Sequence, residues 1–184
     1  MMPIGPLMIE HRLIERMISL MDREVRRLQQ GGRLKSGFID TAVRFIRVYA
    51  DQCHHGKEEN VLFRELGKKP ISVEHQQVLE ELVQEHRWGR ETVWALSESN
   101  DRYRRGDLEA ISSIIDCMLK LVKFYPAHIE KEDDHFFLPV MEYFSEEEKD
   151  GMLKEGLSFD SDLLHRDYAD HVSELERTSE TEEE

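Results

Sequence analysis

The sequence is poor in residues that interrupt helices or cross-link the chain. Its 184 residues include only five prolines, ten glycines and two cysteines. Two cysteines allow at most one disulfide, which excludes the class of small disulfide-rich secreted domains. The first ten residues lack the basic segment and long apolar run of a secretory signal, and no stretch is long and apolar enough to cross a membrane. We therefore expect a cytoplasmic protein with reduced thiols.

Positive charge is also scarce. The chain carries 25 Lys and Arg against 39 Asp and Glu, a net charge of −14 at pH 7. Such a balance argues against nucleic acids and anionic membranes as partners, because both repel an acidic surface. Part of the negative charge lies in residues 174–184, which hold six acids and one arginine. We expect this segment to be a solvated, frayed end.

Apolar residues recur every three or four positions along most of the chain. This spacing puts them on one helix face and predicts long helices over about residues 4–30, 36–67, 72–105 and 107–139. Ser72 and Asp107 are suited to cap the third and fourth helices. Short links favour an all-α, up-down-up-down four-helix bundle. We assign this bundle to residues 1–144, and residues 145–184 to a short C-terminal helix with an acidic tail.

Two short stretches repeat one pattern. Residues 54–59 read His-His-Gly-Lys-Glu-Glu and residues 128–133 read His-Ile-Glu-Lys-Glu-Asp, so His54 precedes Glu58, and His128 precedes Glu132, by four positions. Residues four apart share one face of an α-helix, so each stretch offers an imidazole and a carboxylate to the same point. Imidazole suits iron, zinc or copper, and a carboxylate can bridge two cations. The repeat therefore favours a two-metal centre.

Further histidines lie on the apolar stripes of the predicted helices. In an antiparallel bundle, His54, His86 and His128 fall at similar depths, roughly 18–21 Å from one end. Burial of two carboxylates in such a core is costly unless cations neutralise them. The candidate metal ligands are His11, His54, Glu58, His86, His128 and Glu132.

The adjacent histidines of the second helix require a choice of register. At about 100° per residue, His54 lies about 50° from the centre of the apolar face and points inward, whereas His55 lies about 150° from it and points to the side or outward. We therefore exclude His55, with Glu59, from the ligand set. On the fourth helix, Tyr125 and His135 share the line of His128, and they are candidates to support the ligands or to pack in the core.

Taken together, Glu-His at residues 10–11 and 85–86, HHxxEE at 54–59 and HIxKED at 128–133 resemble the hemerythrin-like family, also called the HHE cation-binding domain. The resemblance covers about residues 4–141. It implies a four-helix bundle with a non-haem di-iron centre that has oxo or hydroxo and carboxylate bridges. By this resemblance, Glu58 and Glu132 bridge two iron ions and the histidines bind terminally. Zinc is a possible substitute for iron.

The third helix departs from the family pattern. Oxygen-carrying members place two histidines one turn apart there, whereas Leu82 and Arg90 flank His86 at that spacing and His75 is too far away. The pattern is therefore one histidine short, which implies an open metal position and argues against reversible oxygen carriage. Arg90 is expected either to hydrogen-bond an anion at that position or to form an ordinary ion pair.

The resemblance implies three kinds of function. The leading interpretation is a non-enzymatic di-iron protein that binds or senses oxygen, nitric oxide or redox state, so that its partner is a small diatomic gas or an oxidant. The second is a di-iron enzyme or an iron donor that acts on peroxide or nitric oxide or repairs iron–sulfur clusters. The third is a structural bundle that holds zinc.

Overall fold

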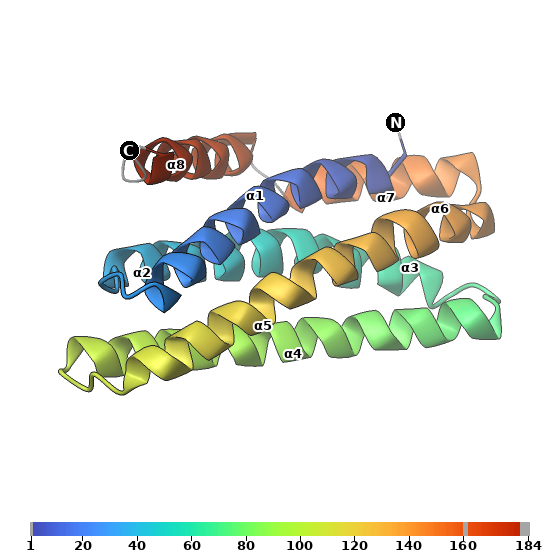
Figure 1. The fold of residues 1–184 in the computed structure, drawn as a ribbon. Coiled ribbons are helices and arrows are strands. Elements are labelled where there is room, and N and C mark those ends of the chain that lie inside the picture. Colours follow the sequence, from blue (N-terminus) through green and yellow to red (C-terminus); the bar gives the residue numbers. More distant parts are fainter. Residues whose placement is uncertain (1, 160–161, 181–184) are drawn as a thin grey trace.

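The computed structural model describes residues 2–159 and 162–180, and within these residues the regular secondary structure is entirely helical. The prediction of an all-α fold is confirmed. Four long helical stretches, here called rods 1 to 4, make up the first three quarters of the chain (Figure 1). The rods are formed by α1 (Ile4–Gln29); by α2 (Ser36–Phe45), η1 (Ile46–His55), η2 (Glu58–Phe63) and α3 (Arg64–Leu66); by α4 (Val73–Arg104); and by α5 (Ala110–Glu130), η3 (Lys131–Phe136) and α6 (Phe137–Val140).

Rods 2 and 4 are not uniform α-helices. The segments η1, η2 and η3 are π-helical, with wider turns than the α-helical segments that flank them. A short 3₁₀ turn, η4 (Met141–Tyr143), follows rod 4. Two further helices then complete the described chain, α7 (Glu146–Phe159) and α8 (Asp162–Glu180), where a single C-terminal helix was expected.

Capping residues define where the third rod begins and ends, but not where the fourth begins. Ser72 caps α4, as predicted, because its hydroxyl oxygen accepts a hydrogen bond from the backbone N–H of His75. Gly106 follows α4 with a φ of 98°, a left-handed conformation that favours glycine. The prediction for Asp107 is wrong. Helix α5 begins only at Ala110, and the Asp107 carboxylate instead accepts hydrogen bonds from Arg102.

The rods pack in a closed order, with each rod against the next and rod 4 against rod 1. Their apolar faces form two separate core clusters, one around Met21 and Leu96 and the other around Leu82 and Phe136. On each rod, the candidate metal ligands fall where one cluster ends and the other begins. The fold therefore holds a layer of polar side chains between two hydrophobic layers.

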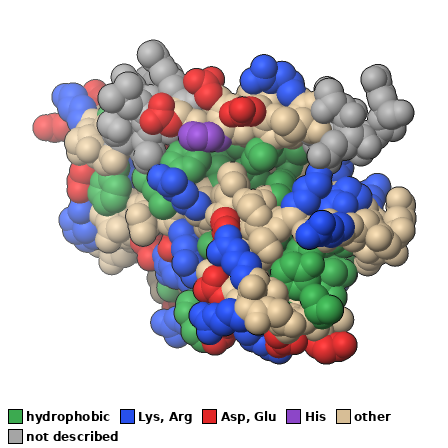
Figure 2. Space-filling view, turned by 90° about the vertical axis from the view of Figure 1, so that its left-hand side faces the viewer, with side chains coloured by type: hydrophobic (Ala, Val, Ile, Leu, Met, Phe, Trp, Pro, Cys, Tyr) green, Lys and Arg blue, Asp and Glu red, His purple; other side chains and the backbone are tan. Residues whose placement is uncertain are grey.

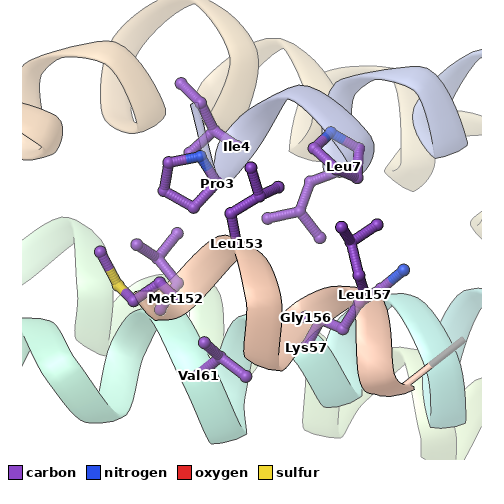
Figure 3. Close-up of a pocket in the computed structure, with 11 residues that line it drawn as sticks. Pro3, Ile4, Leu7, Lys57, Val61, Met152, Leu153, Gly156 and Leu157 are labelled. Carbon is purple, nitrogen blue, oxygen red and sulfur yellow. The ribbon is translucent and has the colours of Figure 1, made fainter. Parts of the chain in front are cut away.

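The two C-terminal helices cover different parts of the bundle. Figure 3 shows Leu153 and Leu157 of α7 extending toward the first turns of α1, where Ile4 and Leu7 lie, and this contact encloses a small cavity. Helix α8 lies against α1 and η1. Its Val172 is fully buried in the first core cluster. These apolar contacts explain why residues beyond the bundle form helices.

Part of the acidic C-terminal segment is ordered, contrary to the expectation of a frayed end. Residues 174–180 belong to α8, and Glu176 accepts hydrogen bonds of 3.0 and 2.7 Å from Arg16 of rod 1. Residues 181–184 lie outside the described residues. Among the described helices, none is long and apolar enough to cross a membrane. Despite the net charge of −14, the end of the molecule in Figure 2 presents many Lys and Arg side chains.

Candidate metal centre

Both repeated motifs lie in or beside π-helical turns. His54 and His55 end η1, Glu58 begins η2, and Glu132 lies in η3 directly after the α-helical turn of His128. A π-helix bonds each N–H to the fifth preceding carbonyl, so it contains more residues per turn than the 3.6 of an α-helix. A side-chain direction calculated at 100° per residue is therefore wrong within and beyond these turns.

His55 shows the effect of the wider turns. The side chain was expected to point outward, but it is only 3% exposed. Its ring stacks on that of His86, with ring centroids 3.9 Å apart and an angle of 12° between the planes. Neighbouring side chains in a π-turn diverge less than in an α-turn, so both His54 and His55 enter the core. The inference that the site is one histidine short no longer follows.

The structure brings together all six residues that the sequence singled out. Each is at most 2% exposed. Their imidazole nitrogens and carboxylate oxygens belong to two groups. Within each group, these atoms all lie within 4.8 Å of one another. The first group contains His11, His54, Glu58 and Glu132, and the second contains His55, His86 and His128.

The two carboxylates connect these groups. One oxygen of Glu58 lies 3.2 Å from Nε2 of His54, and the other lies 3.4 Å from Nε2 of His86. Glu132 Oε2 lies 3.3 Å from Nε2 of His11 and 3.4 Å from Nε2 of His128. Two ligands bound to one ion at about 2.0–2.2 Å are separated by roughly 3.0–3.5 Å. The observed separations thus match the edges of a coordination polyhedron.

The hydrogen bonding of these atoms gives an independent test of whether metal fits. The Nε2 atoms of His11, His86 and His128 are buried without a hydrogen-bond partner, as are both oxygens of Glu58 and of Glu132. Buried polar atoms are nearly always satisfied, and an uncompensated buried carboxylate is especially costly. A pair of cations among these atoms would satisfy them all, so the donor set fits a two-metal centre.

On the side away from this centre, each imidazole bonds through Nδ1 to a carboxylate. The four short contacts are His11–Asp133 at 2.8 Å, His54–Glu10 at 2.9 Å, His86–Glu59 at 2.8 Å and His128–Glu85 at 2.7 Å. A fifth and longer contact, of 3.4 Å, joins His55 to Asp51. A carboxylate at Nδ1 fixes the ring orientation and the tautomer that leaves Nε2 available for a metal.

A cation contacts each of these carboxylates in turn. The pairs are Arg12 with Asp133, Lys57 with Glu10, Arg90 with Glu59 and with Asp51, and Lys131 with Glu85. Sequence reasoning missed this outer layer, although acids lie directly beside the motif residues. Of the two expectations for Arg90, the ion pair is the one found, at 2.7 Å to each carboxylate.

The charges of this layer shift the pKa values of the imidazoles in the metal-free protein. Burial lowers the pKa of His54, but the charges of Glu58 and Glu10 outweigh it and raise the pKa to about 10. Burial also lowers the pKa of His86, but Glu132, Glu59 and Glu58 outweigh it and raise this pKa to about 9. The pKa of His55 is instead held well below its usual value by burial and by the neighbouring His86, His54 and His128 rings. His55 is therefore a neutral imidazole.

The other residues considered in the sequence analysis differ in their burial and in their distance from the centre. Tyr125 is buried, and this burial raises its pKa, so its phenol keeps its proton. His135 is exposed, which contradicts its expected place on the line of His128. It lies within the π-helical η3, where α-helical spacing does not apply. His75 is hydrogen-bonded to Tyr143 away from the centre. Leu82 is fully buried in the second core cluster.

Comparison with known proteins agrees with this geometry. The family model described as the hemerythrin HHE cation binding domain matches residues 2–140. Comparison with curated proteins and with solved structures found no match. The matched residues span α1 to α6 and contain every candidate ligand, whereas α7 and α8 follow the match. The chain therefore belongs to the hemerythrin HHE cation-binding domain family.

Proposed function

We propose that this chain is a cytoplasmic non-haem di-iron protein that binds or senses a small diatomic gas, an oxidant or redox state. In this proposal the rods form an up-down-up-down bundle around the two ions. The observation that carries it is the position of Glu58, whose two oxygens face His54 on one side and His86 on the other. A carboxylate placed in this way serves two ions rather than one.

The donor set divides between the two ions. His11 and His54 would hold one ion, and His55, His86 and His128 would hold the other, with Glu58 and Glu132 shared. Imidazole and carboxylate together suit iron, and also zinc. Bound iron supplies one-electron chemistry and a coordination position for a small ligand. Zinc has no redox chemistry, so it cannot supply the first of these.

The protein's own contribution is orientation and exclusion of water. The Nδ1 carboxylates hold the imidazole rings, and the two apolar clusters close the polar layer from both sides. The ion beside His11 would have fewer protein donors than the ion beside His86, since it has two imidazoles rather than three. Because fewer donors leave more room for an external ligand, we assign gas binding to the His11 side.

The test begins with metal content. Protein purified without added metal, and then loaded with ferrous iron, is expected to bind two ions per chain by elemental analysis and to develop the visible absorption of a coupled ferric pair. Glu132→Ala should lower the count to one or none. The matched control is Glu130→Ala, because Glu130 is exposed on the same rod. A wild-type count of one ion after iron loading would contradict the proposal.

Two further measurements separate the alternative functions. A colourless protein that retains zinc in preference to iron would favour the structural role. Turnover of peroxide or nitric oxide by the iron-loaded protein, at a rate above that of free iron, would favour an enzyme. Stoichiometric spectral change with nitric oxide or oxygen, without turnover, is the result expected of a binding or sensing protein.

A further inference from the structure

An open groove between η1 and α4 leads from the surface to His55. Its volume is about 530 Å³, and both His55 and Tyr125 are among the residues that line it. Arg47 and Trp94 lie in the same lining and are exposed, so they mark its outer part. The groove therefore joins solvent to one of the imidazoles of the metal centre.

The lining of this groove is rich in hydrogen-bond donors. Two guanidinium groups, Arg47 and Arg90, line it together with the indole of Trp94 and the protonated phenol of Tyr125. The acid in the lining is Asp51, and its Oδ1 accepts a 2.7 Å hydrogen bond from Arg90 Nε. Arg90 is balanced by Asp51 and by Glu59, to which it also donates, so the positive charge of the groove lies at its outer end, on Arg47. A positive group at the mouth attracts anions.

His55 has the longest Nδ1 contact among the imidazoles of the centre. Its Nδ1 lies 3.4 Å from Asp51, whereas the corresponding contact of His86 is 2.8 Å and that of His128 is 2.7 Å. Asp51 is also shared with Arg90, which binds Glu59 as well. The groove therefore reaches the centre at the imidazole with the weakest Nδ1 hydrogen bond.

We propose that this groove binds small inorganic anions and admits them to the metal centre past His55. Arg47 attracts the anion at the outer end, and Tyr125 donates a hydrogen bond to it further in, while Arg90 keeps its ion pairs with Asp51 and Glu59. Anion binding in the groove stands on these residues alone, whereas passage to the metal rests on the proposed di-iron function. The small cavity beneath α7 in Figure 3 is a poor alternative route for anions, because leucine, isoleucine and methionine side chains dominate its lining.

Anion binding in the groove can be measured without metal. In a Trp88→Phe background, Trp94 is the remaining tryptophan, and iodide is an anionic quencher of its fluorescence. Arg47→Glu should lower iodide quenching at least about threefold at low salt, and less at high salt, because the attraction is screened. Quenching by uncharged acrylamide should not change. Equal iodide quenching in both proteins would overturn the anion site, whatever the metal content.

Passage to the metal is tested with azide in the iron-loaded protein. Gly89 lines the groove on α4, and a Cβ added there meets Phe124 at 3.7 Å, an ordinary contact. The backbone therefore has room for a Cβ at this position. Gly89→Met, with its folding verified by circular dichroism, should narrow the groove and slow azide association at least about tenfold in stopped-flow absorption. Arg47→Glu should do the same at low salt. Leu153→Phe, in the cavity beneath α7, is the matched control and should leave the rate unchanged.

The metal count of each variant is determined first, so the two proposals fail differently. If two ions are bound but Gly89→Met and Arg47→Glu leave the azide rate unchanged, or if Leu153→Phe slows it, the groove is not the route and the di-iron function stands. If azide produces no spectral change in protein with two ions, passage to the metal is likewise overturned. If no pair of ions is bound, the proposed function itself fails.

Discussion

Glu85 immediately precedes His86 in the sequence, yet its carboxylate lies 2.7 Å from Nδ1 of His128 on the next rod. The other rods repeat this arrangement. Glu10 of rod 1 bonds His54 of rod 2, Glu59 of rod 2 bonds His86 of rod 3, and Asp133 of rod 4 bonds His11 of rod 1. The carboxylates therefore connect each rod to the next in a closed ring around the metal centre.

The cations follow the same order. Each comes from the rod that supplies the histidine, and it lies one to four residues beyond that histidine, as Lys57 does after His54 and Lys131 after His128. Each carboxylate is thus held by an imidazole and a cation of one neighbouring rod. Because these contacts do not include the centre itself, we expect the ring to orient the ligands before metal binds.

The first prediction concerns the two adjacent histidines. His54→Ala and His55→Ala should both lower the iron content toward one ion per chain or less, because both imidazoles are buried beside the centre. Elemental analysis of the iron-loaded variants measures this. His171→Ala is the control, since His171 is exposed on α8. Full iron content in His55→Ala would show that His55 is not a ligand.

The second prediction concerns the ring. Lys57 is only 4% exposed and contacts the buried carboxylate of Glu10. Lys57→Met should lower the free energy of unfolding of the metal-free protein by about 3 kcal/mol, because it leaves a buried charge with less compensation. Urea denaturation measures this change. Adding Glu10→Gln should restore part of the loss.

The control for this experiment is a surface ion pair. Lys68 and Glu65 form a 2.7 Å contact, but the Lys68 side chain is 61% exposed. Lys68→Met should therefore change the free energy of unfolding by less than about 1 kcal/mol. An equal effect of Lys57→Met and Lys68→Met would mean that the buried contact of Lys57 with Glu10 contributes no more to stability than a surface ion pair.

The third prediction concerns metal removal. Ions that bind only the folded chain stabilise it by roughly 4 kcal/mol at a thousandfold excess over the dissociation constant. Chelation should consequently lower the melting temperature by about 10 °C, measured by circular dichroism with elemental analysis of the same sample. An unchanged melting temperature after verified removal of metal would place the bound ions outside the core.

The fourth prediction concerns pH. In the metal-free protein the pKa of His54 is raised from 6.5 to about 10 and that of His86 from 6.5 to about 9. A raised pKa in the folded state stabilises the protein fully below pH 6.5, and the contribution is lost as pH rises through the folded-state value. Unfolding free energy of the metal-free protein should therefore fall progressively from pH 6.5 to about 10.

The metal-loaded protein is the comparison for the pH experiment. In the proposed function, metal replaces the protons on these imidazoles. The stability of the loaded protein should then show little of this decline, and loading at pH 7 should release protons that an indicator dye detects. A metal-free protein whose stability is constant between pH 6.5 and 10 would show that His54 and His86 are not charged in the folded state.

The amino-acid sequence by itself determined the helical rods and the inward direction of most candidate ligands. Apolar residues at intervals of three and four define a helix face wherever the turn is regular, so His11 and His86 could be placed on it from spacing alone. The repeated His-x-x-x-Glu pattern identified Glu58 and Glu132 for the same reason, because four residues span about one turn of either helix type.

Tertiary structure decided the remaining features. His55 enters the core because η1 has wide turns, and a π-helix is stable only where surrounding contacts compensate for its poorer backbone geometry. The acids of the ring are visible in the sequence beside His11 and His86, but each bonds a histidine of another rod. Those partners depend on which rods are neighbours and on their relative depth, which local spacing does not encode.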